Sequence, residues 1–100
     1  MKRVKKTAFP SVPILQDAEV LGAAVRACRT EAGMTIDEAA MSLGVAKQTL
    51  HDLEMGKPTV GLGLVLKITQ GLGLSLIVLQ KHDAAYVINN LVSELRKDSH

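Results

Sequence analysis

A short polar stretch near the middle of the chain contains the side chains best suited to recognition chemistry. These are Lys47, Gln48, Thr49 and His51. A glutamine amide can make two hydrogen bonds to adenine, a lysine can reach guanine O6 and N7 or a phosphate, and a threonine offers both a methyl group and a hydroxyl. The stretch is therefore either a surface that contacts nucleic-acid bases or an ordinary solvated helix face.

Asp52 lies on the same helix face as Gln48 and complicates this interpretation. A carboxylate near phosphates is repelled unless it accepts a hydrogen bond from the N4 amine of cytosine. Two roles for Asp52 therefore stay open. One is a contact with a base, and the other is a structural or electrostatic-tuning role within the protein.

The sequence contains no arrangement of residues that is typical of a catalytic or metal site. His51 and Asp52 are adjacent, but a helix separates adjacent side chains by about 100°. The Gly-Leu-Gly stretch at 61–63 lacks the third glycine and the preceding strand of a dinucleotide site, and the three histidines lack metal-ligand spacing. Cys28 falls on an apolar helix face, which is typical of a small core residue. We expect no enzyme activity, no metal site and no cofactor.

Composition restricts the class of protein. The 100 residues are 47% apolar and 22% charged, which favours one folded domain with tails. A single cysteine excludes an intramolecular disulfide framework and favours a reducing cytosol. Prolines interrupt the apolar stretch near the N-terminus, and Lys67 and several glycines interrupt the one at 60–79. We therefore expect neither a signal peptide nor a membrane span.

The positive charge is concentrated at the N-terminus. Residues 1–16 contain no acidic side chain, whereas their basic side chains are Lys2, Arg3, Lys5 and Lys6. Pro10 and Pro13 favour extended backbone, so we expect a flexible arm. Two alternatives stay open for it: an arm that contacts DNA, or a disordered solubilising tail.

Helix signals follow this arm. Asp17 can cap a first helix over about 18–32, which Gly33 ends. The sequence Thr35-Ile36-Asp37-Glu38 is a capping box that begins a second helix over 36–43. A third helix is expected over about 46–54, with Leu50 and Leu53 facing inward. Two short helices joined by a glycine-containing turn form a helix-turn-helix pattern.

The remaining chain predicts three more elements. A fourth helix covers about 60–71, a strand covers 74–80, and a last helix runs over about 83–96. The chain contains no second strand signal. The strand must therefore pair with another molecule or be covered.

The spacing of residues from the first helix to the end of the third resembles the phage-repressor and Cro-like (XRE) DNA-binding domains. The matching residues are Arg29, Gly33, Thr35, Glu38-Ala39-Ala40, Gly44-Val45, Leu50, Leu53-Glu54 and Gly56-Lys57. Within that family, the run Leu72-Gly73-Leu74-Ser75-Leu76 is most similar to HipB-type antitoxins. The resemblance implies an all-α, lambda-repressor-like domain of five helices, with a short C-terminal strand that forms an intermolecular sheet in a dimer.

The resemblance also implies a division of the chain. Residues 1–16 are the basic arm, 17–73 the DNA-binding domain, 74–81 the dimerisation strand, and 82–100 the C-terminal helix and tail. The implied dimer contacts are Leu74, Leu76 and Val78.

Specific roles follow from the resemblance for the polar residues. The N-terminus of the third helix enters the major groove in this family. The residues that the resemblance places in contact with DNA are Ala46, Lys47, Gln48, Thr49 and His51. Thr35 at the start of the second helix meets a phosphate in addition to its capping role. Arg29 and Glu54 form a structural ion pair between the first and third helices.

The predicted function is that of a bacterial, cytoplasmic and nucleoid-associated repressor. It binds palindromic double-stranded operator DNA as a homodimer, regulates its own promoter, has no membrane partner, and is the antitoxin of a HipA-type Ser/Thr kinase toxin. Two alternatives stay open. One is a prophage-type regulator without a toxin partner, and the other is a protein-interaction adaptor, which the net acidic balance of residues 35–57 favours.

Overall fold

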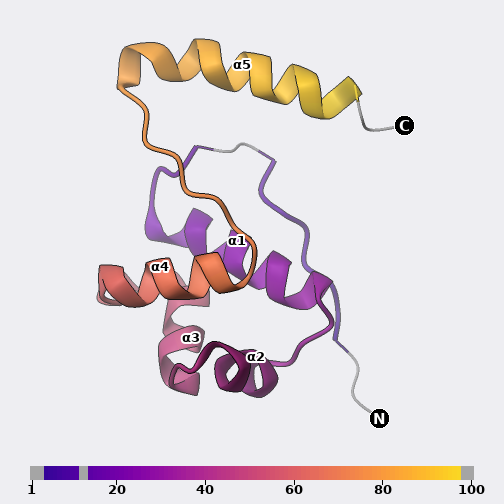
Figure 1. Ribbon diagram of the computed structural model, residues 1–100, viewed down its shortest axis with the longest axis vertical. Coiled ribbons are helices and arrows are strands. Elements are labelled where there is room, and N and C mark those ends of the chain that lie inside the picture. The colour runs from indigo at the N-terminus through magenta and orange to yellow at the C-terminus, as the bar shows by residue number, and fades with distance from the viewer. Residues whose placement is uncertain (1–3, 12–13, 98–100) are drawn as a thin grey trace.

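The computed structural model describes residues 4–11 and 14–97. Figure 1 shows the helices of this part in chain order: α1 (Ala18–Glu31), α2 (Ile36–Leu43), α3 (Lys47–Glu54), α4 (Leu62–Gly71) and α5 (Lys81–Lys97). The helices α1 to α4 pack together, and α5 lies apart from them beyond the segment 72–80. The prediction of a five-helix, all-α architecture is confirmed.

Local side-chain contacts explain where the first helices begin. The Asp17 carboxylate accepts a hydrogen bond from the Val20 N–H at 3.0 Å at the start of α1. At the start of α2, the Thr35 hydroxyl accepts from the Glu38 N–H at 3.2 Å, and the Glu38 carboxylate accepts from the Thr35 N–H at 2.9 Å. These contacts satisfy N–H groups that have no partner within a helix.

The turn between α2 and α3 depends on Gly44. Its φ is +70°, in the left-handed region that costs glycine least. This turn allows α2 and α3 to cross with the small side chains of Ala39 and Ala40 buried between their neighbours. The fully buried residues Val25, Leu50 and Ile68 bring α1, α3 and α4 to the same core.

Gly22 permits a close approach between α1 and α3 that the sequence pattern did not indicate. A Cβ atom built at this position would lie 2.5 Å from the Leu53 carbonyl oxygen and 2.6 Å from that of Glu54. Any other residue would push the end of α3 away from α1. The glycine therefore sets how closely the third helix is held.

The segment 74–80 has no regular secondary structure in this single chain, where the sequence predicts a strand. A strand requires hydrogen bonds to a second strand, and the described part of one chain contains none. Leu74 still packs against the core. Val78 is 96% exposed.

The C-terminal helix α5 begins at Lys81, two residues before the predicted start, and runs to Lys97. Its apolar side chains are only partly covered in the single chain, since Val87, Leu91 and Leu95 are exposed. No extensive contact joins α5 to another helix in the described residues.

The described part of the N-terminal arm runs beside α1. The Thr7 N–H donates to the Thr30 hydroxyl at 3.0 Å, and the Lys6 ammonium lies 3.7 Å from the Glu31 carboxylate. Residues 1–3 and 12–13, which include the predicted basic residues Lys2 and Arg3, lie outside the described residues, as do residues 98–100 of the predicted tail.

Candidate nucleic-acid interface

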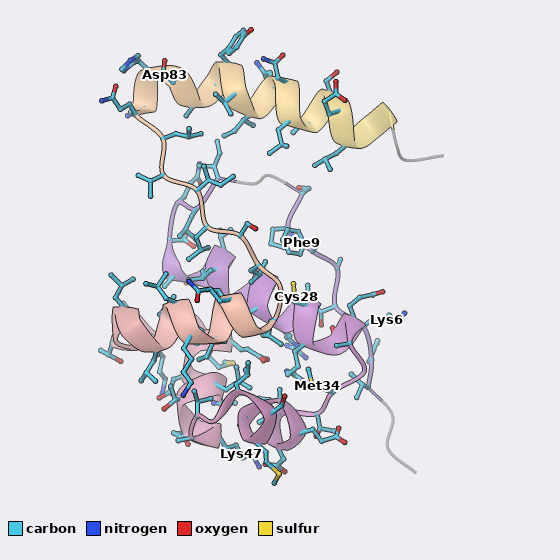
Figure 2. The ribbon with its side chains drawn as sticks, in the orientation of Figure 1. Lys6, Phe9, Cys28, Met34, Lys47 and Asp83 are labelled. Carbon is cyan, nitrogen blue, oxygen red and sulfur yellow. The ribbon has the colours of Figure 1, made fainter. Side chains whose placement is uncertain are left out.

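The buried side of α3 determines which of its residues face outward. Leu50 and Leu53 are buried in the core against α1 and α2. The side chains of Lys47, Gln48 and His51 are consequently exposed, as is that of Ala46 just before the helix, while Thr49 is half-buried. In the view of Figure 2, Lys47 lies at the end of the molecule opposite α5. The predicted polar residues thus lie together in α3, with Gln48 and His51 on the side away from Leu50 and Leu53.

Carboxylates accompany the polar groups of this surface. The Lys47 ammonium lies 3.1 Å from Asp37 Oδ1 in the first turn of α2. Gln48 Nε2 donates to Asp52 Oδ1 at 2.8 Å, and the Lys57 ammonium lies 3.3 Å from the same oxygen. This surface is therefore polar with both signs of charge.

Asp52 is the centre of these contacts. The hydrogen bond from Gln48 lowers the pKa of its carboxyl most, and the neighbouring Lys57 lowers it further, while partial burial opposes both effects. His51 Nδ1 lies 4.0 Å from the same Oδ1 atom. The Asp52 carboxylate is consequently ionised at neutral pH and acts only as an acceptor.

Thr35 lies at the edge of a second, basic region. A hollow of about 330 Å³ beside the N-terminus of α2 is lined by Thr35 and Ile36 together with basic side chains from the arm and from α1, namely Lys5, Arg26 and Arg29. The first N–H groups of a helix and its dipole attract anions. Lys5 and Arg26 were not predicted to lie here, because only the tertiary structure brings the arm to α2.

Lys67 is another basic residue whose position beside the helix-turn-helix was not predicted from the sequence. It lies in α4, and its ammonium donates to the Gly44 carbonyl oxygen at 3.2 Å. A cation is thereby held at the turn between α2 and α3. The two residues are 23 positions apart in the sequence, so no local pattern predicts the contact.

Arg29 and Glu54 form a buried ion pair rather than part of the exposed surface. Arg29 Nε and Nη2 donate to the two Glu54 oxygens at 2.6 and 2.8 Å, and Nη1 donates to the Met34 carbonyl oxygen at 2.9 Å. Their side chains are only 9% and 5% exposed. The pair links α1, the loop before α2 and the end of α3.

The structure does not bring the three predicted dimer residues onto one free surface of the single chain. Leu74 packs against the core, and Leu76 lines a small apolar hollow of about 130 Å³ with Phe9, Ile14 and other residues of the arm and α1. Val78 alone of the three is almost fully exposed. The packing of Leu74 against the chain's own core was not predicted.

Cys28 lines a larger open hollow of about 730 Å³ between the arm and α1, which also includes Phe9 and Leu72. Burial raises the pKa of its thiol, so the unreactive thiol form is favoured. The described residues contain no cluster of metal-ligating side chains. In the same part of the chain, every helix is too short or too polar to cross a bilayer.

The amino-acid sequence is similar to those of known helix-turn-helix proteins. The family model for a helix-turn-helix domain matches residues 20–80. The uncharacterised HTH-type transcriptional regulator y4mF of Sinorhizobium fredii is 44% identical over 59 residues, which cover 59% of this chain and 78% of the relative.

Solved structures with a similar fold include two HipB complexes. A serine-to-alanine variant of HipB in an O2 20-mer complex has a TM-score of 0.63 and 25% identity, covering 71% of this chain and 99% of that chain. A chain of a HipA–HipB–O2–O3 complex has a TM-score of 0.61 and 25% identity, covering 68% of this chain and 96% of that chain.

Proposed function

This chain belongs to the family of helix-turn-helix transcriptional regulators, and from that premise we propose that it is a repressor that binds a specific operator sequence through α3. The observation that carries the proposal is the face of α3, where Leu50 and Leu53 anchor the helix and Lys47 and Gln48 point outward. The N-terminal residues of such a helix contact base edges in the major groove.

The polar residues divide between bases and backbone in this proposal. Lys47 and Gln48 contact base edges, with Ala46, Thr49 and His51 beside them. Thr35 and the N-terminus of α2 contact a phosphate. The basic hollow that Lys5 and Arg26 line beside Thr35 supports this assignment, because it adds positive charge where the phosphate lies.

The operator is palindromic because the repressor acts as a homodimer. The segment 74–80 becomes a strand when it pairs antiparallel with the same segment of a second copy, and Val78 then loses its exposure to water. Two-fold symmetry places the half-sites about one turn of DNA apart, roughly 34 Å, or a multiple of this distance.

The biological partner is a HipA-type kinase toxin, and the repressor acts in the cytoplasm on the promoter of its own operon. The likeness to HipB in a complex with HipA supports this part of the proposal. Purification of the tagged protein from its host, followed by mass spectrometry, tests it. We expect a co-purified kinase, and its absence together with specific promoter binding would instead favour a regulator without a toxin.

A mobility-shift experiment tests DNA binding. The probes are a duplex from the protein's own promoter and a scrambled duplex of the same length and composition. We expect tighter binding to the promoter, and we expect Gln48→Ala to weaken that binding by about 1–3 kcal/mol and to reduce the preference. Equal binding of both duplexes by the unaltered protein contradicts the proposal.

A further inference from the structure

Asp52 is the acceptor around which the outward face of α3 is organised. It lies one helical turn after Gln48, a spacing at which side chains on a helix meet. Its Oδ1 atom accepts the Gln48 Nε2 hydrogen bond at 2.8 Å and lies 3.3 Å from the Lys57 ammonium. The Asp52 side chain is only 24% exposed, whereas Gln48 is open to solvent.

The hydrogen bond to Asp52 leaves most of the Gln48 amide free. A primary amide has two N–H donors and one carbonyl acceptor, and Asp52 uses one donor. One N–H group and the Oε1 atom remain. Adenine presents the N7 acceptor and an N6–H donor in the major groove, so the remaining pair of groups still complements adenine.

The same contact restricts how the amide is turned. The last torsion of a free glutamine side chain is broad, and the amide can present its oxygen or its nitrogen in either direction. An ionised carboxylate accepts hydrogen bonds but cannot donate them, and Gln48 and Lys57 lower the pKa of Asp52. The nitrogen of the Gln48 amide is therefore directed toward Asp52.

We propose that Asp52 is a positioning residue that selects adenine at one operator position by orienting the Gln48 amide, without itself touching the DNA. The inference rests on the proposed function, in which α3 contacts bases. It differs from a direct Asp52 contact with cytosine, because the carboxylate lies one turn farther from the helix N-terminus and is already engaged by Gln48 and Lys57.

The experiment begins with a pool of randomised duplexes from which the unaltered protein selects its own site. The selected duplex and its single-base variants then serve as probes for Gln48→Ala, Asp52→Ala and Asp52→Asn. We expect Gln48→Ala to lose a preference of about 5- to 150-fold for adenine at one position. Asp52→Ala is expected to lose most of the preference at that same position.

Asp52→Asn is the matched control. Its amide oxygen can still accept the Gln48 hydrogen bond, but the negative charge is gone, as it is in Asp52→Ala. We expect Asp52→Asn to retain more of the preference for adenine than Asp52→Ala but less than the unaltered protein, because the amide nitrogen of asparagine can also donate to Gln48 Oε1 and so allows the reversed orientation. Any gain in affinity from removing a charge that repels phosphates is expected to be equal in the two variants and for all sequences.

A double variant separates positioning from a general structural role. Asp52→Ala added to Gln48→Ala is expected to change the base preference no further, because the amide that Asp52 orients is already missing. Circular dichroism checks that each variant remains helical. Should Asp52→Ala fail to fold, Asp52→Ser repeats the test, since its short side chain cannot reach the amide.

Other outcomes overturn the inference in distinguishable ways. An unchanged adenine preference in Asp52→Ala rejects positioning while leaving DNA binding by α3 intact. Loss of a cytosine preference at a different position would assign Asp52 to a direct base contact. If the unaltered protein selects no sequence from the pool, both the proposed function and this inference fail.

Discussion

The helices α1 to α4 and the region 74–97 have similar apolar patterns but different surroundings. In the first region, Val25, Leu50 and Ile68 are completely buried in one core. In the second, Val78 and apolar residues of α5 such as Leu95 remain exposed. An apolar stripe therefore predicts a helix in both regions, whereas burial depends on whether the same chain supplies a partner surface.

This difference assigns separate roles to the two regions. The first is held by contacts within one chain, including the buried pair Arg29–Glu54 and the capping box of Thr35 and Glu38. The second presents apolar surface at the opposite end of the molecule from Lys47 (Figure 2). The proposed pairing of 74–80 with a second copy therefore leaves the polar face of α3 open.

The largest expected effect is on the buried ion pair of the first region. Arg29→Ala leaves the Glu54 carboxylate buried without its partner, and we expect the free energy of unfolding to fall by about 3–5 kcal/mol. Urea denaturation measures this change. Lys6→Ala is the control, because the Lys6–Glu31 pair is exposed and such pairs contribute about 0–1 kcal/mol. Equal losses of unfolding free energy in the two variants would contradict the greater importance of the buried pair.

The second effect concerns the close approach of α1 and α3. We expect Gly22→Ala to destabilise the fold by about 1–3 kcal/mol, because the added methyl group meets the carbonyl oxygens of Leu53 and Glu54. Gly63→Ala is the matched control, since a Cβ there has open space around it and alanine favours the helix. Thermal unfolding of both variants compares them. A stabilised Gly22→Ala variant would show that the helices can separate at little cost.

The third prediction probes the second region, where we expect assembly to change more than folding. Val78→Asp is expected to alter the stability of the monomer by no more than about 0.5 kcal/mol, because the side chain is exposed. Sedimentation is expected to show monomers, with weakened operator binding. Ile77→Asp is the control. Neighbouring strand residues face opposite sides of a sheet, so we expect this variant to remain a dimer. An intact Val78→Asp dimer would mean that this segment does not join the copies.

The smallest expected effect is the acid dependence of the α3 surface. The Gln48 hydrogen bond and then Lys57 lower the pKa of Asp52 in the folded chain. The resulting stabilisation is present above the unfolded pKa of about 3.9 and is lost as the pH falls through the lower folded pKa. In this acid range, we expect the stability of Asp52→Asn to fall less steeply with decreasing pH than that of the unaltered protein. Superimposable acid-unfolding curves for the two proteins would contradict this.

Sequence patterns were most informative where contacts are local. Asp17 and the Thr35–Glu38 capping box lie within three residues of the groups that they bind, and they correctly indicated where α1 and α2 begin. The polar face of α3 followed from the spacing of Leu50 and Leu53. The Arg29–Glu54 contact was implied only by the family resemblance, because 25 residues separate its partners.

Contacts between distant residues could not be predicted in this way. The Lys67 contact with Gly44 and the arrival of Lys5 beside Thr35 depend on how the helices and the arm pack. The strand predicted at 74–80 has no partner in the described part of one chain, so its β-branched residues do not make it a strand here.

Helix positions, caps and outward faces were thus encoded in the order of the residues, because each depends on groups within one or two turns. The tightness of the α1–α3 contact at Gly22, the basic hollow beside α2 and the contact of Lys67 with Gly44 emerged only in three dimensions. Spacing limits which side chains can meet, but packing determines the distance and direction at which their atoms interact.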